Sequence, residues 1–374
     1  MKALLLSMSF GEGHNSTAKS LCAYLESMGF ETEMLDTIAH LSHLIGDTVS
    51  KGYLKMASDA KFVYKGAYRL AEKRNKSNSD IAPARSTANL VGRKLLKYIN
   101  SYDPDVIICT HVFPSIILDL MKERGELRAK TVGIVTDFMF HPYWEEATHL
   151  DYVVVPSEQM MCQAKKKGFA EAQVIPMGIP INPKFAQRVR TKEQARAELG
   201  LDINKRTVLF MSGGAGFGDI KQTVKEIDAI EQDFQLITVC GSNIRAKARI
   251  DRLKTKKRIL NLGFVDYIDK LMDAADCIIT KPGGLTSSEA LAKSLPMILV
   301  NPVPGQEDRN LQFLTNNGVA MSASSTAPID DVLYQLLADP RRVEVMRQAV
   351  EIIAKPDSTR NICEFVKSIC ESVR

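Results

Sequence analysis

Short runs of apolar residues alternate along the whole chain with stretches whose apolar residues recur every three to four positions. The first pattern predicts buried strands and the second predicts amphipathic helices. Strands and helices in this alternating order form parallel sheets covered by helices on both faces. In the first half, strands are expected at 3–7, 33–35, 106–110, 131–136, 152–156 and 173–175. In the second half they are expected at 207–211, 235–239, 259–262, 277–280 and 297–300. We therefore predict an α/β protein with two doubly wound domains.

The boundary between the two domains is expected at a segment rich in proline, residues 176–183. Its three prolines exclude a helix or a central strand and indicate an extended connector. We predict one domain at 1–180 and a second at 181–354. Pro356 interrupts a helical pattern near the end of the chain, and a last helix is expected at 358–371. Residues 355–374 are expected to return to the first domain.

Length and composition are those of a folded globular protein in the cytoplasm. The 374 residues are 45% hydrophobic and 25% charged, which excludes a disordered chain. No run approaches the roughly 20 apolar residues of a membrane-spanning helix, and the apolar start of the chain is interpreted as a first strand, not a signal peptide. The seven cysteines are scattered without a CxxC pair, which is typical of free thiols in a reducing compartment.

The net charge of +5 is unevenly distributed. Residues 51–97 carry twelve Lys or Arg and three acidic residues, a net +9, and aromatic residues are interleaved with them. Basic residues mixed with aromatic ones favour a helix lying in the headgroup region of an anionic membrane. The cations predicted to contact the membrane are Lys61, Lys65, Arg69 and Lys73. A solvated basic face is the main alternative, and nucleic acid is a weaker one because no nucleic-acid-binding motif is present.

In the first half, three polar residues follow predicted strands. His14 follows the first strand within a glycine-containing turn, at a helix expected to start near Asn15, while His111 and Asp137 end the strands at 106–110 and 131–136. Ligands bind beyond the carboxyl ends of parallel strands, so the three side chains are expected to share one site. Each of them alone could equally be a satisfied polar group at a strand end.

In the second half, two glycine-rich turns each follow a strand and open a helix, at 212–219 and 280–289. Such turns present backbone N–H groups to phosphate. Neither the dinucleotide-binding motif GxGxxG nor the P-loop motif GxxxxGK[ST] is present. The sequence therefore lacks the motifs that usually indicate NAD binding or a P-loop ATPase. A third loop, 301–310, gathers Gln306, Glu307 and Asn310, whose side chains suit the hydroxyls of a sugar. A plain proline-rich turn with a helix cap explains the prolines and Gly305 of that loop, but it explains this cluster less well.

These motifs, in this order and spacing, resemble those of the diacylglycerol glycosyltransferases. The residues that carry the resemblance are Gly11-x-Gly13-His14, the loop 213–218, Gly263-Phe264-Val265, the 280–291 segment TKPGGLTSSEAL, and Pro304-Gly305-Gln306-Glu307-x-x-Asn310. The family includes bacterial diglucosyldiacylglycerol synthases and plant monogalactosyldiacylglycerol synthases. Thr136-Asp137-Phe138 with His141 and Trp144 also resembles its acceptor-domain motif. A more distant similarity is to the N-acetylglucosaminyltransferase that makes lipid II.

The resemblance implies a GT-B fold, in which two Rossmann-like domains face an interdomain cleft. The second domain would bind a UDP-sugar. The residues implied in donor binding are Phe264 and Val265 at uracil, Glu289 at the ribose, Gly213, Gly214, Gly284 and Thr286 at the diphosphate, and Gln306 and Glu307 at the hexose. The first domain would hold diacylglycerol or a glycosyl-diacylglycerol at the inner face of the cell membrane. Asp308 stands where a second glutamate is frequent, which leaves open whether the hexose is glucose or galactose.

An inverting transfer requires a base at the acceptor hydroxyl and stabilisation of the departing UDP. A neutral imidazole suits the first task, so His14 is predicted as the base and Asp137 as its orienting partner or as the base itself. Helix N-termini and backbone amides suit the second task, so no metal or cofactor is expected. The Asp103-Pro104-Asp105 sequence precedes a strand and is interpreted as a turn rather than a Mg²⁺ site. The alternatives are a UDP-sugar 2-epimerase-like enzyme and a non-catalytic nucleotide-sugar sensor.

Overall fold

The computed structural model describes residues 1–9, 12–37, 39–40, 83–211, 213 and 219–372. The predicted membrane-contacting residues (Lys61, Lys65, Arg69 and Lys73) and Gly214 lie outside these ranges. The chain divides into two compact units. Unit 1 comprises residues 1–183, 304–306 and 357–374, and unit 2 comprises residues 184–303 and 307–356. The first division thus falls three residues after the boundary predicted from the prolines.

Unit 1 is built on a parallel sheet of six strands in the order β2-β1-β3-β4-β5-β6. The strands are β1 (Lys2–Ser7), β2 (Glu31–Asp36), β3 (Val106–Cys109), β4 (Lys130–Ile134), β5 (Tyr152–Val154) and β6 (Val174–Ile175). All six were expected from the apolar runs, within one or two residues at most ends. In the register between the neighbouring strands β1 and β3, Leu4 pairs with Ile107.

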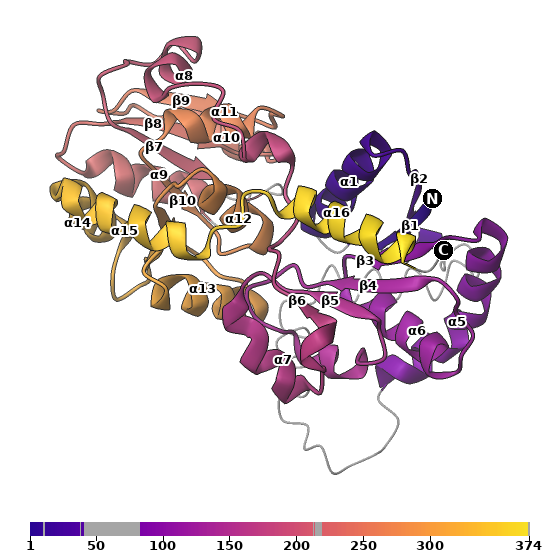
Figure 1. Ribbon diagram of the computed structural model, residues 1–374. Helices are drawn as coiled ribbons and strands as arrows, with labels where there is room; N and C mark the ends of the chain where they lie inside the picture. Colours follow the sequence, from indigo (N-terminus) through magenta and orange to yellow (C-terminus); the bar gives the residue numbers. More distant parts are fainter. Residues whose placement is uncertain (10–11, 38, 41–82, 212, 214–218, 373–374) are drawn as a thin grey trace. The chain divides into compact units, whose positions relative to one another are not determined.

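Helices cover both faces of this sheet, as Figure 1 shows. They are α1 (Glu12–Ser27), α5 (Pro83–Tyr102), α6 (Val112–Glu123), α7 (Met161–Lys167) and α16 (Ser358–Glu371). Successive strand residues point to opposite faces, so Leu5 packs in a core with α1 and α16. Leu4 packs in the opposite core with α5, α6 and α7. Each face therefore has its own apolar cluster.

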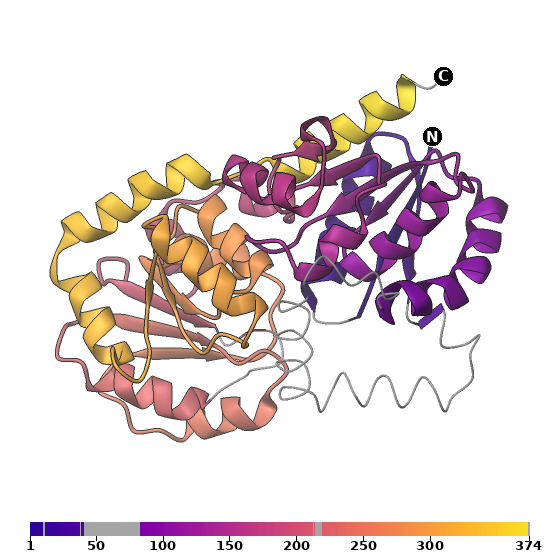
Figure 2. The same cartoon turned by 90° about the horizontal axis from the view of Figure 1, so that it is seen from below.

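The C-terminal helix α16 belongs to unit 1, although the whole of unit 2 separates it in sequence from the rest of that unit. Its Cys363 lies 3.8 Å from the carbonyl oxygen of Leu21 in α1, and Ile362 and Val366 are fully buried beside it. Ser358 and Thr359 donate to the carbonyl oxygens of the proline-rich connector. Both views place α16 on the same sheet as β1, at the start of the chain (Figures 1 and 2).

Unit 2 also contains a parallel sheet of six strands, in the order β12-β11-β10-β7-β8-β9. The strands are β7 (Thr207–Met211), β8 (Gln235–Val239), β9 (Ile259–Leu262), β10 (Cys277–Thr280), β11 (Met297–Leu299) and β12 (Ala320–Ser322). Four of the five predicted strands have the expected bounds, and β11 ends one residue earlier than predicted. The edge strand β12 was not predicted, because three residues are too few to show a period.

The helices of unit 2 are α8 (Lys192–Glu198), α9 (Ile220–Ala229), α10 (Ile244–Asp251), α11 (Ile268–Ala274), α12 (Gly284–Ala292), α13 (Gln306–Asn316), α14 (Ile329–Ala338) and α15 (Pro340–Ile353). Helix α8 starts at Lys192, because the side chain of Thr191 caps it by accepting a hydrogen bond from the backbone N–H of Gln194. One face of the sheet packs against α9, α10 and α14 in a cluster that includes Phe210, Val224 and Leu333. Among the described residues, no helix is both long and apolar enough to cross a membrane.

Candidate active site

The three polar residues predicted in the first half follow three adjacent strands of unit 1, namely β1, β3 and β4. The strands are parallel, so their carboxyl ends share one edge of the sheet. One expectation was wrong in detail. Helix α1 begins at Glu12, not near Asn15, so His14 lies within its first turn instead of in the loop before it. Glycine is a poor helix former, so the glycines of that turn kept the sequence pattern from indicating where the helix starts.

His14 is held by two contacts to the neighbouring strand ends. Its Nδ1 lies 2.7 Å from the carbonyl oxygen of Thr110 and 3.2 Å from Oγ1 of Thr136. A carbonyl oxygen only accepts hydrogen bonds, so Nδ1 carries the proton and donates it to Thr110. In the neutral ring the lone pair is then on Nε2. This is the tautomer that a base acting through Nε2 requires.

His111 is the N-cap of α6, and its Nδ1 accepts a hydrogen bond of 3.0 Å from the backbone N–H of Phe113. Its tautomer is therefore the opposite of that of His14, with the proton on Nε2. The two rings meet edge to face, with centroids 4.7 Å apart. Burial holds the pKa of His111 well below its usual value, and the nearby His14 and His141 lower it further. His111 is thus a neutral imidazole beside His14.

The charge state of His14 is set by opposing effects. Burial lowers its pKa below the usual 6.5, while the carboxylate of Asp137 and the hydrogen bond to Thr110 act to raise it. Burial is the largest effect, so the imidazole is mainly neutral at pH 7. His14 therefore interacts electrostatically with both His111 and Asp137. The imidazole of His14 can accept a proton, and the carboxylate of Asp137 can stabilise the resulting cation.

In unit 2, the predicted donor-binding residues also follow strands of one parallel sheet. Gly213 follows β7, Phe264 and Val265 follow β9, Gly284 and Thr286 follow β10, and Glu307 follows β11. Gly213 has a φ of +78°, a conformation that favours glycine. Phe264 is a large apolar residue that is 79% exposed. Gln306 is the exception, because residues 304–306 group with unit 1 and not with the predicted donor domain.

The N-terminus of α12 has the features of a phosphate site. Its N-cap is Gly283, which supplies no side-chain cap. The first backbone N–H groups of a helix have no partner within the helix, and they favour anions. Gly284 and Thr286 lie in this first turn. Ser288 donates to the carbonyl oxygen of Gly284 at 2.8 Å, and Ser287 is fully buried.

Glu289 lies one turn further along α12 and has an unusual protonation behaviour. Burial raises the pKa of its carboxyl to about 8; Lys184 lowers this value and Asp269 raises it. Lys184 is itself engaged by Asp269, with 3.1 Å between Nζ and Oδ1. A buried carboxyl with so high a pKa is typical of a functional group.

The loop after β11 is tied to the turn after β10 by two side chains. Glu307 Oε1 lies 3.0 Å from Nζ of Lys281, and its Oε2 accepts a hydrogen bond of 2.6 Å from the backbone N–H of Val303. Asn310 is fully buried and donates to the carbonyl oxygen of Pro282 at 3.0 Å. Sequence analysis assigned no role to Lys281. Its position directly before the glycine-rich turn is the sequence feature that could have indicated a role.

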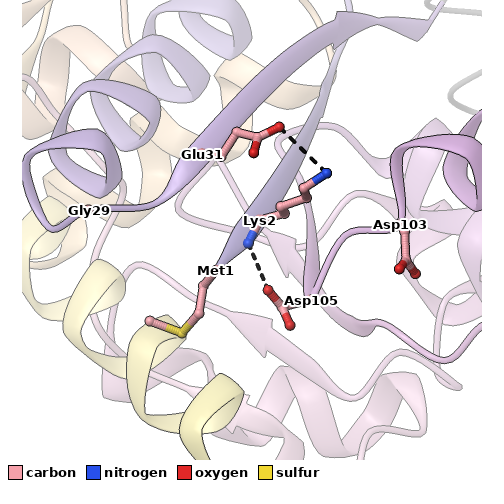
Figure 3. A pocket seen from close by; sticks show the side chains of 6 residues that line it. All are labelled: Met1, Lys2, Gly29, Glu31, Asp103 and Asp105. Carbon is pink, nitrogen blue, oxygen red and sulfur yellow. Dashed lines mark hydrogen bonds and ion pairs between the residues drawn. The ribbon is translucent and has the colours of Figure 1, made fainter.

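A hollow of about 480 Å³ lies at the opposite, amino-terminal edge of the sheet in unit 1 (Figure 3). Lys2 begins β1, and its backbone N–H donates to Oδ2 of Asp105 at 2.7 Å, while its Nζ lies 3.7 Å from Oε1 of Glu31. Asp103 has a φ of +50°, which suits a turn. The Asp103-Pro104-Asp105 sequence is therefore a turn whose second aspartate holds the start of β1.

One trio within the described ranges has potential metal ligands close together, namely Asp119, Glu123 and His149, within 4.8 Å of one another. Asp119 and Glu123 lie in the second half of α6, away from its N-terminus beside His14. The buried carboxylate of Asp119 accepts hydrogen bonds from both the backbone N–H and Nδ1 of His149, at 2.5 and 3.2 Å. These bonds explain the cluster as a link between α6 and the loop before β5.

Solved structures define the class of the fold. MurG from Acinetobacter baumannii matches with a TM-score of 0.63 and 14% identity, over 98% of this chain and 99% of that one. The UDP-GlcNAc 2-epimerase from Neisseria meningitidis matches with a TM-score of 0.64 and 14% identity, over 98% and 100%. The fold is therefore GT-B, as predicted. Both transferases and epimerases have this fold, so the fold alone does not distinguish the two activities.

Sequence comparison identifies the family. Residues 14–181 match the monogalactosyldiacylglycerol (MGDG) synthase family, and residues 207–356 match the glycosyltransferase family 28 C-terminal domain. The processive diacylglycerol beta-glucosyltransferase of Bacillus pumilus is 30% identical over 98% of this chain and 94% of its own. Monogalactosyldiacylglycerol synthase 1 of Arabidopsis thaliana is 28% identical over 100% and 71%. The chain belongs to the diacylglycerol glycosyltransferase family, as its motifs indicated.

Proposed function

We propose that the protein transfers glucose or galactose from a UDP-sugar to diacylglycerol or a glycosyl-diacylglycerol, with inversion at C1 and without a metal ion or other cofactor. The lipid acceptor is supported by the similarity to the processive diacylglycerol beta-glucosyltransferase and to monogalactosyldiacylglycerol synthase 1. The donor is supported by HepE from Anabaena, solved in complex with UDP and similar in fold with a TM-score of 0.58. The proposal competes with a 2-epimerase-like activity and with a non-catalytic sensor.

The observation that carries the catalytic role is the 2.7 Å contact between Nδ1 of His14 and the carbonyl oxygen of Thr110. It leaves the lone pair of a neutral ring on Nε2. In the proposed reaction, Nε2 takes the proton of the acceptor hydroxyl as the oxygen forms a bond to C1 of the hexose. The bond from C1 to the diphosphate oxygen breaks, and its electron pair leaves with UDP. The carboxylate of Asp137 then stabilises the imidazolium.

The departing diphosphate needs positive charge where its own negative charge develops. The uncapped N-terminus of α12 supplies backbone N–H groups through Gly284 and Thr286. Together these groups would perform the task that a metal ion performs in other transferases, which is why we propose a reaction that requires none.

The decisive experiment incubates the protein with UDP-glucose, UDP-galactose or UDP-N-acetylglucosamine and diacylglycerol micelles, with and without EDTA. Mass spectrometry of the lipids should show a hexosyl-diacylglycerol in both conditions. Loss of product in EDTA, with recovery on added Mg²⁺, would contradict metal independence. Conversion of the UDP-sugar to its 2-epimer without a lipid product would establish the epimerase, and UDP binding without turnover would establish the sensor.

We also propose that the enzyme works as a peripheral protein at the inner face of the cell membrane. The support is the +9 charge of residues 51–97 and their interleaved aromatic residues. Substituting glutamine for Lys61, Lys65, Arg69 and Lys73 should weaken binding to anionic vesicles and leave UDP affinity unchanged. Equal vesicle binding of the variant and the wild type at low salt would favour the solvated-face alternative.

A further inference from the structure

A second short segment of the chain concentrates positive charge, and it lies in unit 2. Residues 245–258 contain eight Lys or Arg and one acidic residue, Asp251, a net +7. The whole chain carries only +5 and residues 51–97 carry +9, so the remaining residues sum to −11. Nearly all of the excess positive charge therefore resides in two separate segments, one of which the structure describes completely.

The segment forms α10 and the loop that leads to β9 (Figure 1). Ala246 and Ile250, four residues apart, are the buried positions of the helix. Arg245, Arg249 and Arg252 follow one another at intervals of four and three residues, so they lie along one helical face, and all three are exposed. Lys254 in the loop is also exposed. The cations are thus gathered on the side of α10 that points away from the core.

Several basic residues of the segment are already engaged within unit 2. Lys247 lies 2.9 Å from Oδ2 of Asp251, and Lys257 donates to the carbonyl oxygen of Ile230 at 2.6 Å. Arg258 donates to the carbonyl oxygen of Gly200. By contrast, the part of the chain that the structure describes offers no carboxylate partner to the side chains of the other five cations, Arg245, Arg249, Arg252, Lys254 and Lys256.

An exposed apolar residue adjoins these cations. Ile244 is the first residue of α10 and is 80% exposed. A large apolar side chain beside several unneutralised cations is the combination found in segments that lie at a lipid surface. Headgroup phosphates would neutralise the arginines, and the apolar side chain would enter the acyl boundary. Nucleic acid would satisfy the charges but would leave the isoleucine without a partner.

We propose that this α10 surface, defined as Ile244, Arg245, Arg249, Arg252 and Lys254, binds the anionic headgroups of a membrane. The inference rests on the proposed function, because an enzyme whose acceptor is a membrane lipid must work at that surface. Cations near an anionic membrane contribute about 1 kcal/mol each, and the contribution decreases with salt. Unit 2 therefore adds its own attachment to the membrane, separate from that of residues 51–97.

The test measures sedimentation of the full-length protein with phosphatidylcholine vesicles that contain or lack phosphatidylglycerol, at low and high salt. The test variant replaces Arg249, Arg252 and Lys254 by glutamine. The matched control replaces Arg128, Arg342 and Arg347, which removes the same charge elsewhere on the surface. We expect the test variant to bind the anionic vesicles about ten- to a hundredfold more weakly at low salt, and the control to bind within a few-fold of the wild type.

If the test variant and the control lose binding equally, net charge alone explains the result and the proposal is wrong. The proposal is also wrong if the test variant keeps vesicle binding but loses affinity for a random-sequence DNA duplex. Hexosyl transfer in neutral detergent micelles should be equal in the test variant and the wild type. If the wild type binds anionic vesicles through α10 but transfers no hexose, the proposed function is contradicted and the proposed role of the α10 surface is not.

Discussion

Lys281 Nζ and Glu307 Oε1 form an ion pair at 3.0 Å, and the two residues come from the turn after β10 and the loop after β11. Their side chains are only 12% and 19% exposed. The family resemblance predicts that Glu307 binds the hexose. The structure adds that one carboxylate oxygen is oriented by Lys281 and the other by the backbone N–H of Val303. Each oxygen keeps a further lone pair for a sugar hydroxyl, so Lys281 is a positioning residue for Glu307.

Replacing Lys281 by methionine should therefore impair use of the whole donor more than binding of UDP. Removing one member of a mostly buried pair costs roughly 3 kcal/mol or more and lets the carboxylate reorient. We expect the KM for the UDP-hexose to rise by about tenfold or more, while the Kd for UDP, measured by calorimetry, changes less. Lys281→Arg is the control and should retain most of the affinity. Equal losses for UDP and UDP-hexose would place Lys281 at the diphosphate only.

The assignment of His14 as base predicts a large and specific kinetic defect. General-base catalysis typically contributes about 10²- to 10⁴-fold, so His14→Ala should lower kcat by that range. UDP affinity should not change, because the predicted donor turns belong to unit 2. Asp137→Asn should lose less if Asp137 only stabilises the imidazolium. A comparable or larger loss in Asp137→Asn, with activity retained in His14→Ala, would identify the aspartate as the base.

The pKa of His14 predicts the position of the acid limb of the pH profile. The base acts only when neutral, so kcat/KM should fall as pH decreases through the pKa of His14, below the usual 6.5. Because Asp137 raises this pKa, Asp137→Asn should shift the limb to still lower pH, even though the rate falls. A limb that moves to higher pH in this variant would contradict the electrostatic role.

Glu289 should link donor binding to stability. Its pKa of about 8 lies well above that of an ordinary glutamate, which means that the folded state disfavours the carboxylate. Folding then takes up a proton between pH 4.5 and 8, and the free energy of unfolding decreases as pH rises through that window. Glu289→Gln should remove this pH dependence, so its Tm should exceed that of the wild type increasingly towards pH 8.

The same substitution should weaken donor binding if Glu289 contacts the ribose. Calorimetry with UDP at pH 8 should show at least a severalfold higher Kd for Glu289→Gln. Uridine, which keeps the ribose and lacks the diphosphate, is the matched ligand and should lose affinity by a similar factor. Unchanged affinity for both ligands would show that Glu289 affects stability but does not contact the donor.

Gly133 is expected to tolerate no side chain, because it lies in β4 directly against Trp144. A Cβ at this position would lie 2.8 Å from Cζ3 of Trp144 and 3.0 Å from Cδ1 of Leu150. Gly133→Ala should destabilise the protein by about 1–3 kcal/mol through overpacking, measured by denaturant unfolding. Gly92→Ala is the control: it lies in helix α5, its Cβ would meet nothing closer than 3.7 Å, and alanine should stabilise it by about 0.5–1 kcal/mol.

Much of the fold follows from local sequence signals. The strands β7, β8, β9 and β10 have the bounds that their apolar runs predicted, and α16 spans the expected residues. These elements can be predicted because a buried strand or helix face requires apolar residues at regular intervals, and a helix end requires a capping residue close by in the sequence. The order of the glycine turns and the polar loop was also sufficient to indicate the family, since each motif lies within about ten consecutive residues.

Other features depend on residues far apart in sequence and were decided only by the tertiary structure. The tautomer of His14 is set by Thr110, 96 residues away, and Glu307 is oriented by Lys281, 26 residues away. The short strand β12 exists because β11 offers it a partner edge, with Met297 paired to Ala320. A local pattern reports the environment of its own residues, whereas charge state, tautomer and edge pairing are properties of the groups that folding brings beside them.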